Sequence, residues 1–192
     1  KSVFYLNTLV MQNTYKILSL LLDYPNEELK ENLSGVMGIV EEESYLDEPQ
    51  RVKLQVFIDY VLSLSLTGWQ QQYVQLFDFS THSNLYLFDH VYGDSRERGQ
   101  AMVDLTEMYA GSGFTPCSNE LPDYLPLFLE YLSLLTRVEE SEKLLHEVSH
   151  ILDNMKQALE KKETPYVLLL DILHSLSTPL ESEPDKKKGV SV

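Results

Sequence analysis

The sequence predicts an all-α fold, a single helical bundle. Along nearly the whole chain, apolar residues recur with the i, i+3, i+4, i+7 spacing of a helix that buries one face. No segment shows the strict alternation typical of a strand, and no repeat has a solenoid period. The 192 residues, of which 43% are hydrophobic, can bury a substantial core without disulfides or metals.

The first half of the chain is expected to contain four helices. Each corresponds to one apolar stripe, and each stripe is bounded by a turn or a capping residue. Pro25 ends the first, Asn26 can cap the second, and Gly68 is expected to break the third. The expected ranges are 17–22, 26–45, 54–62 and 69–79.

The stretch HVYGDSRERGQAM, residues 90–102, predicts a turn followed by a helix. Gly93 permits a sharp backbone bend, and Asp94 suits the N-cap. Glu97 follows three residues later, so the pair resembles a capping box. Gly99 inside a helix should cost about 1 kcal/mol relative to alanine. We therefore expect another backbone, or a ligand, to approach it closely.

The second half is expected to contain four further helices, after a short apolar piece at residues 85–90. Glycines 111 and 113 should end the first of them. Asp123 is the expected N-cap of the next, and Pro126 can occupy its first turn, where a missing amide costs little. The expected ranges are 95–110, 125–135, 144–159 and 166–176.

The domain is expected to span residues 11–178. Residues 1–10 form an N-terminal extension before a natural start at Met11, without the small-residue cleavage site of a secretory signal. Residues 179–192 are polar and charged, and are expected to form a flexible tail.

Charge and composition exclude several classes of partner. The formal net charge of −15 makes nucleic acid and an anionic membrane surface poor partners. It suits a basic partner, although solubility alone would also account for it. No apolar run reaches the roughly 18–20 residues needed to cross a bilayer, so we expect no direct membrane insertion. The single cysteine, Cys117, excludes an internal disulfide and fits a reducing cytosol.

Enzyme hypotheses find little support in the sequence. There is no phosphate-binding glycine loop and no nucleophile elbow. Glu147 and His150, and likewise Asp171 and His174, have the Glu-x-x-His spacing of helical di-iron proteins. Glu147 and His150 flank the apolar stripe, however, so solvated helix faces are the favoured interpretation. The di-iron enzyme and a helical adaptor for another client stay open as alternatives.

The segment ELPDYLPLFLEYL, residues 120–132, combines carboxylates with aromatic rings. Glu120, Asp123 and Glu130 could form an acidic patch beside Tyr124. The alternative is a capped amphipathic helix with solvated carboxylates. Further back in the chain, Tyr73 and Phe77 of QQQYVQLFDFS are expected in the core or lining a groove.

Three of these strings, taken together, resemble a known family. YVQLFD, HVYGDSRERGQAMVDL and ELPDYLPLFLEYL occur in the order and spacing of the NarJ-type assembly chaperones of respiratory nitrate reductase, part of the wider TorD-like group. The early segment YKILSLLLDYP resembles the family's opening helix. The resemblance runs from about Met11 to Ser177. It departs from the wider group at Tyr124, where relatives often carry histidine.

The resemblance implies an all-helical, non-enzymatic chaperone without a cofactor of its own. Its partner would be the catalytic (alpha) subunit of nitrate reductase, bound in the cytoplasm through the N-terminal segment of that subunit. The chaperone would keep the subunit competent for molybdenum cofactor insertion before membrane attachment.

A client groove is expected between the helices that begin at Asp94 and Asp123. We expect at least one of two arginines in the first helix to pair with carboxylates of residues 120–130, although exposed surface pairs contribute only about 0–1 kcal/mol. The candidate peptide-binding residues are Tyr73, Phe77, Arg96, Arg98, Glu120, Asp123, Tyr124 and Glu130.

Overall fold

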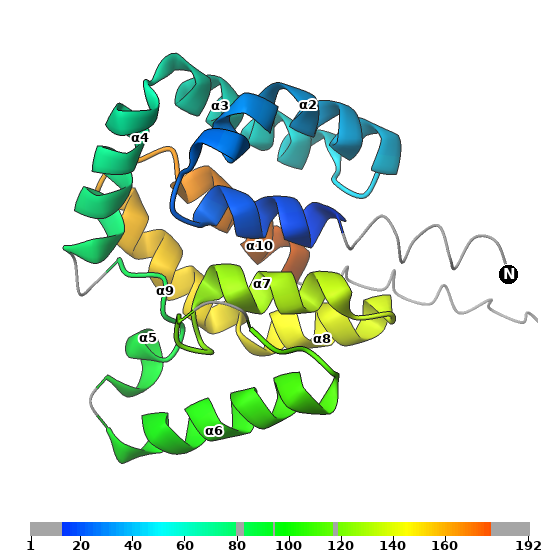
Figure 1. The fold of residues 1–192 in the computed structure, drawn as a ribbon, viewed down its shortest axis with the longest axis vertical. Coiled ribbons are helices and arrows are strands. Elements are labelled where there is room, and N and C mark those ends of the chain that lie inside the picture. The colour runs from blue at the N-terminus through cyan, green and yellow to red at the C-terminus, as the bar shows by residue number, and fades with distance from the viewer. Residues whose placement is uncertain (1–12, 80–82, 94, 117–118, 178–192) are drawn as a thin grey trace, which may run out of the picture.

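Helices dominate the fold, as Figure 1 shows. The computed structural model describes residues 13–79, 83–93, 95–116 and 119–177, and no strand forms within these ranges. One isolated antiparallel bridge joins Tyr86 to Tyr124. The predicted all-α class is confirmed. The predicted extension at 1–10 and tail at 179–192 lie outside the described residues.

The N-terminal half forms a run of helices with side-chain caps. Residues 13–22 are helical. Asn26 caps the next helix by accepting from the Leu29 amide at 2.8 Å, and Asp47 forms a capping box with Gln50. The helices that follow residue 26 are α2 (Glu27–Glu43), α3 (Glu48–Ser63), α4 (Leu66–Tyr73) and a π-helical turn, η1 (Val74–Asp78).

The break after α3 falls earlier than predicted. The chain turns at Leu64, and Ser65 caps α4 by accepting from the Gly68 amide at 3.0 Å. Gly68 therefore lies inside the first turn of α4 instead of ending a helix. The serine hydroxyl satisfies an otherwise unpaired amide, so the cap determines where the new helix starts.

The C-terminal half builds the rest of the bundle. The predicted 144–159 helix is divided at Val148, whose backbone leaves the helical region at φ −98°, ψ 6°. Pro126 occupies the first turn of its helix, as predicted. The elements are α5 (Asp89–Tyr92), α6 (Arg96–Gly111), α7 (Leu125–Leu134), α8 (Val138–Glu147), α9 (Ser149–Glu160) and α10 (Val167–Ser177).

One contiguous hydrophobic core connects the described helices. The C-terminal helix α10 packs against α3, α8 and α9. Trp69 of α4 is fully buried, and its indole N–H donates to the Tyr166 hydroxyl at 2.7 Å. By contrast, α6 contributes only Leu105 and Tyr109 as buried residues, and Figure 1 shows it at one edge of the molecule, beyond α7 and α8.

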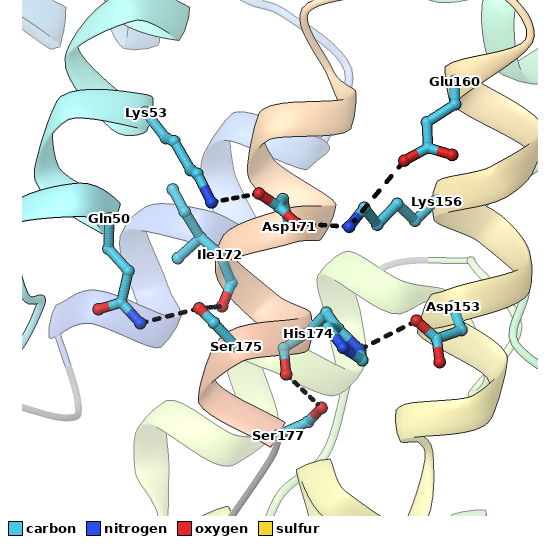
Figure 2. Close-up of polar contacts among 10 residues, drawn as sticks. All are labelled: Gln50, Lys53, Asp153, Lys156, Glu160, Asp171, Ile172, His174, Ser175 and Ser177. Atoms are coloured by element: carbon cyan, nitrogen blue, oxygen red, sulfur yellow. Dashed lines mark hydrogen bonds and ion pairs between the residues drawn. The ribbon is translucent and has the colours of Figure 1, made fainter. Parts of the chain in front are cut away.

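Charged hydrogen bonds also hold α10 in place, as Figure 2 shows. Asp171 accepts from Lys53 of α3, and from Lys156 of α9 at 2.6 Å. Burial alone would raise the pKa of the Asp171 carboxyl, but the hydrogen bonds from the two lysines outweigh it and leave that pKa below its ordinary value. One carboxylate therefore connects three helices.

Candidate functional site

The motifs singled out from the sequence meet where residues 85–88 run beside residues 123–125. The Leu87 amide donates to the Asp123 carbonyl at 2.9 Å, and the Leu125 amide donates to the Leu85 carbonyl at 2.7 Å. This pairing places the rings of Tyr86 and Tyr124 side by side, with centroids 5.4 Å apart.

Asp123 lies at the centre of this junction and is fully buried. Its Oδ2 accepts from the Phe88 amide at 3.0 Å, and Arg98 Nη2 approaches the same oxygen at 4.0 Å. Burial raises the pKa of the Asp123 carboxyl, against the opposing effects of the Phe88 amide and Arg98. The predicted roles of Asp123 as N-cap and as part of an exposed acidic patch are therefore wrong. Tyr124 occupies the N-cap position of α7.

The first turn of α6 differs from the prediction in two ways. Gly93 adopts φ +52° and so makes the expected bend, but the N-cap is Ser95. The predicted cap, Asp94, lies outside the described residues. Gly99 faces open space, since no atom outside the neighbouring backbone of its own helix would lie within 4 Å of a side chain at this position. The expected close approach at Gly99 is wrong, because α6 packs through Leu105 and Tyr109 instead.

The two arginines of α6 have different surroundings. Arg98 Nη1 pairs with Asp89 Oδ1 at 2.5 Å, in addition to its approach to Asp123. Arg96 is exposed and forms no ion pair with any described residue. One arginine therefore has a structural role, and it reaches one carboxylate of the predicted 120–130 segment.

A cavity of about 240 Å³ lies on one side of the junction, and we call it the acidic tyrosine pocket. Carboxylates and tyrosine rings from several elements surround it, and among its described lining residues none has a basic side chain. The lining residues are Asp23, Tyr24, Tyr73, Phe77, Asp78, Asn84, Leu85, Tyr86, Glu120 and Tyr124.

Tyrosine hydroxyls orient the carboxylates of this pocket. Tyr86 donates to Glu120 Oε2 at 2.6 Å, and Tyr124 donates to Asp23 Oδ1 at 3.0 Å. The hydroxyls of Tyr73 and Tyr124 lie 2.8 Å apart. Burial raises the pKa values of all three tyrosines, so these hydroxyls stay protonated and available as donors.

A second cavity, of about 270 Å³, lies between α6 and the pair α7 and α8, and we call it the apolar groove. The client groove was predicted between the same two helices, α6 and α7, but none of the eight predicted site residues lines this cavity. Most of its walls are hydrophobic, with two carboxylates among them. The lining residues are Leu87, Phe88, Tyr92, Ala101, Asp104, Leu105, Met108, Phe128, Leu144, Glu147 and Val148.

The structure thus distributes the eight predicted site residues over several places. Tyr73, Phe77, Glu120 and Tyr124 line the acidic tyrosine pocket. Arg98 and Asp123 form the junction, and Arg96 is exposed. Glu130 does not join them, because it pairs with Lys16 of the first helix.

Six lining residues of the acidic tyrosine pocket were missed by the sequence interpretation: Asp23, Tyr24, Asp78, Asn84, Leu85 and Tyr86. A signal existed for three of them. Asp23 and Tyr24 form the turn before Pro25, and Asp78 follows Phe77 in a stretch already singled out. Nothing in the sequence indicated that Tyr86 would lie beside Tyr124, since that contact depends on the pairing of two distant segments.

The residues of the di-iron alternative are not brought together. Asp171 pairs with two lysines, His174 lies 3.1 Å from Asp153, and Glu147 lies 3.8 Å from Lys143. In the described ranges, no group of three or more histidine, cysteine, aspartate or glutamate residues has the geometry of a metal site. No described helix is both long and apolar enough to span a membrane.

Comparison with solved structures identifies the class of fold. A crystal structure described as a redox enzyme maturation protein from Archaeoglobus fulgidus superimposes with a TM-score of 0.60 at 22% identity. The match covers 86% of this chain and 92% of the other. At this identity the match shows the fold alone: the two chains share one all-helical fold.

The chain belongs to the nitrate reductase delta subunit family, whose model matches residues 43–170. It is 36% identical to the nitrate reductase molybdenum cofactor assembly chaperone NarJ of Escherichia coli K12, over 90% of this chain and 73% of that protein. A Bacillus subtilis protein named as a NarJ chaperone is 33% identical, over 88% of this chain and 90% of its own length. These relatives are named as assembly chaperones and not as catalytic enzymes, which confirms the predicted non-enzymatic class.

Proposed function

We propose that this protein is a chaperone for the catalytic (alpha) subunit of a respiratory nitrate reductase. It binds the N-terminal segment of the apo-subunit in the cytoplasm and supports molybdenum cofactor insertion before the enzyme attaches to the membrane. Membership of the nitrate reductase delta subunit family supports this proposal, as do the names of its relatives in two bacteria.

The apolar groove is the observation that carries the proposal. Helix α6 packs on the rest of the bundle with only two buried residues, Leu105 and Tyr109. A cavity is left beside this contact, and Met108 of α6 lines it together with Phe128 and Leu144. An amphipathic helix lying across such a groove can place an apolar side chain or two in a cavity of about 270 Å³, and burial of that apolar surface favours binding. A short N-terminal segment of a client can supply such a helix.

The charge of the groove favours a basic client segment. Asp104 of α6 and Glu147 of α8 both line the groove, and among its described residues none is basic. The whole chain has a formal net charge of −15. A negative field around an apolar cleft steers cationic ligands toward it, so association should slow as the salt concentration rises.

Filling the groove tests this proposal. Ala101 is a small, partly buried lining residue, so Ala101→Trp should occupy the space that the client helix needs. We expect the affinity for a peptide of the client's N-terminal segment, measured by isothermal titration calorimetry, to fall about tenfold or more. The matched control is Ala110→Trp, an exposed position of the same helix that does not line the groove.

Equal affinities for Ala101→Trp and Ala110→Trp, with unchanged melting temperatures, would place the client elsewhere. A second titration uses the purified catalytic subunit with and without its N-terminal segment. Equal binding by both forms would contradict the role of that segment. Failure of both to bind would instead favour the alternative of a helical adaptor for another client.

A further inference from the structure

We propose that the N-terminal half of α6, residues 96–104, is a gate in one wall of the apolar groove, and that it opens by local unwinding to admit the client helix. This inference rests on the proposed function and deepens it, because it concerns how the same groove accepts its ligand. The gate contributes Ala101 and Asp104 to the lining of the groove.

The closed groove is too small to hold a helix between its walls. Its volume of about 270 Å³ corresponds to about nine water molecules at roughly 30 Å³ each. Two turns of an α-helix about 10 Å wide occupy on the order of 800 Å³. The closed groove therefore accepts one or two side chains, and a client helix that buries its whole apolar face needs one wall to move.

The wall formed by α6 is attached more firmly at its C-terminal end than at its N-terminal end. The Tyr109 hydroxyl donates to the Pro122 carbonyl at 2.8 Å, and the Tyr109 ring packs on Tyr131 with centroids 4.6 Å apart. The buried residues of the helix are Leu105 and Tyr109, so no residue of the gate is buried. A segment with few buried apolar contacts opens locally more easily than the core does.

Arg98 fastens the gate to the rest of the protein. Its guanidinium group pairs with Asp89 at 2.5 Å and approaches the buried Asp123 at 4.0 Å. By contrast, Gln100 donates to Asp104 at 2.7 Å within the helix itself, and this bond does not join the helix to its neighbours. The closed position of the gate therefore depends largely on one side chain.

Gly99 makes the gate easier to unwind. A glycine inside a helix disfavours the helical state about fivefold relative to alanine, the equivalent of about 1 kcal/mol. Packing does not require a glycine here, because a side chain at this position would point into open space. Gly93, just before the gate, already bends the chain at φ +52°, and an unwound segment can turn away from the groove at this point.

Hydrogen exchange of the free protein tests the gate without any client. The amides of residues 100–104 should exchange by local opening, and so faster than those of α7, most of whose residues are buried. Gly99→Ala should slow the exchange of residues 100–104 about fivefold. The matched control is Gly38→Ala in α2, another helical glycine beside open space, and it should leave that exchange unchanged.

The complementary variant is Arg98→Gln, which removes the charge that fastens the gate. It should speed the exchange of residues 100–104 about fivefold or more relative to the amides of α7, whereas Arg96→Gln at an exposed position should not. The gate is refuted if residues 100–104 exchange as slowly as α7 in the wild-type protein. It is also refuted if neither Gly99→Ala nor Arg98→Gln changes their rate.

Titration with a peptide of the client's N-terminal segment tests whether the gate serves the client. If the peptide binds only the open state, its apparent Kd rises as the open fraction falls, so Gly99→Ala should weaken binding about fivefold and Gly38→Ala should not. Equal affinities for Gly99→Ala and the wild-type protein would refute the role of the gate and leave the proposed function intact. If the peptide does not bind the wild-type protein at all, the proposed function fails and the role of the gate fails with it, whereas the exchange rates still decide whether residues 96–104 open.

Discussion

At the scale of single residues, Arg98 connects α6 to the body of the protein through two carboxylates. It pairs with Asp89 at 2.5 Å and reaches the buried Asp123 at 4.0 Å. A buried carboxylate that loses its cation is costly, because neither water nor another charge replaces it. The junction between the two cavities therefore depends on one guanidinium group.

We expect Arg98→Ala to lower the free energy of unfolding by about 1–3 kcal/mol. Arg96→Ala, two residues earlier at an exposed position, should change it by less than about 0.5 kcal/mol. Urea denaturation at neutral pH measures both. The Arg98→Ala deficit should shrink as the pH falls below the raised pKa of Asp123, because a protonated carboxyl needs no cation. If the Arg98→Ala deficit is the same at neutral pH and at a pH below the pKa of Asp123, this role of Arg98 is contradicted.

Residue identities could be predicted more readily than residue environments. Tyr73, Phe77, Glu120 and Tyr124 were assigned to a site from the sequence, and they line one cavity. The environment of Asp123 was not predicted, because the pairing of two distant segments buries its carboxylate and brings the Phe88 amide to it. N-cap preferences favour an aspartate at the start of a helix, and they take no account of a backbone amide that is distant in sequence.

At the scale of the elements, α10 depends on Asp171 as well as on its apolar contacts. The carboxylate joins α10 to α3 and α9 through Lys53 and Lys156, as in Figure 2. Its pKa in the folded protein lies below the ordinary value of 3.8. The contribution of Asp171 to stability is therefore fully present above the unfolded-state pKa, and it is lost as the pH falls through the folded-state pKa.

We expect Asp171→Asn to lower the free energy of unfolding at pH 7 by about 1–3 kcal/mol. The difference from the wild-type protein should narrow as the pH falls below 3.8. Denaturation series between pH 7 and pH 3 measure it. Glu160→Gln is the control, since Glu160 is half-exposed and lies 4.0 Å from Lys156, and it should have little effect at any pH. A difference that stays constant with pH would refute the electrostatic origin.

Helix boundaries could be predicted where a side-chain cap marks them. Asn26 was expected to start a helix and does so through its bond to Leu29. The boundary at Val148 was missed, because apolar residues with helical spacing continue across it from Leu144 to Leu159. When a helix bends without interrupting its apolar stripe, the hydrophobic periodicity of the sequence does not reveal the bend.

At the scale of the whole molecule, the helical spacing of apolar residues was enough to predict the fold class. It did not predict that two separate cavities would lie where one groove was expected. One groove was predicted between two helices, whereas the predicted region borders two separate cavities, the apolar groove and the acidic tyrosine pocket. Residues 85–88 separate them, with Leu85 and Tyr86 lining one and Leu87 and Phe88 the other. A short non-helical segment has no hydrophobic period, so its position beside residues 123–125 could be known only from the folded chain.

Trp69, the only tryptophan of the chain, gives the molecule an internal fluorescent reporter. Its ring is fully buried, its N–H is held by Tyr166, and it lines neither cavity. A tryptophan-free client peptide should therefore leave the wavelength of maximum tryptophan emission unchanged at saturation, whereas urea should shift it to the red in a single transition. A red shift on peptide binding without denaturant would mean that the client opens the core around Trp69. Tryptophan emission would then report client engagement as well as unfolding.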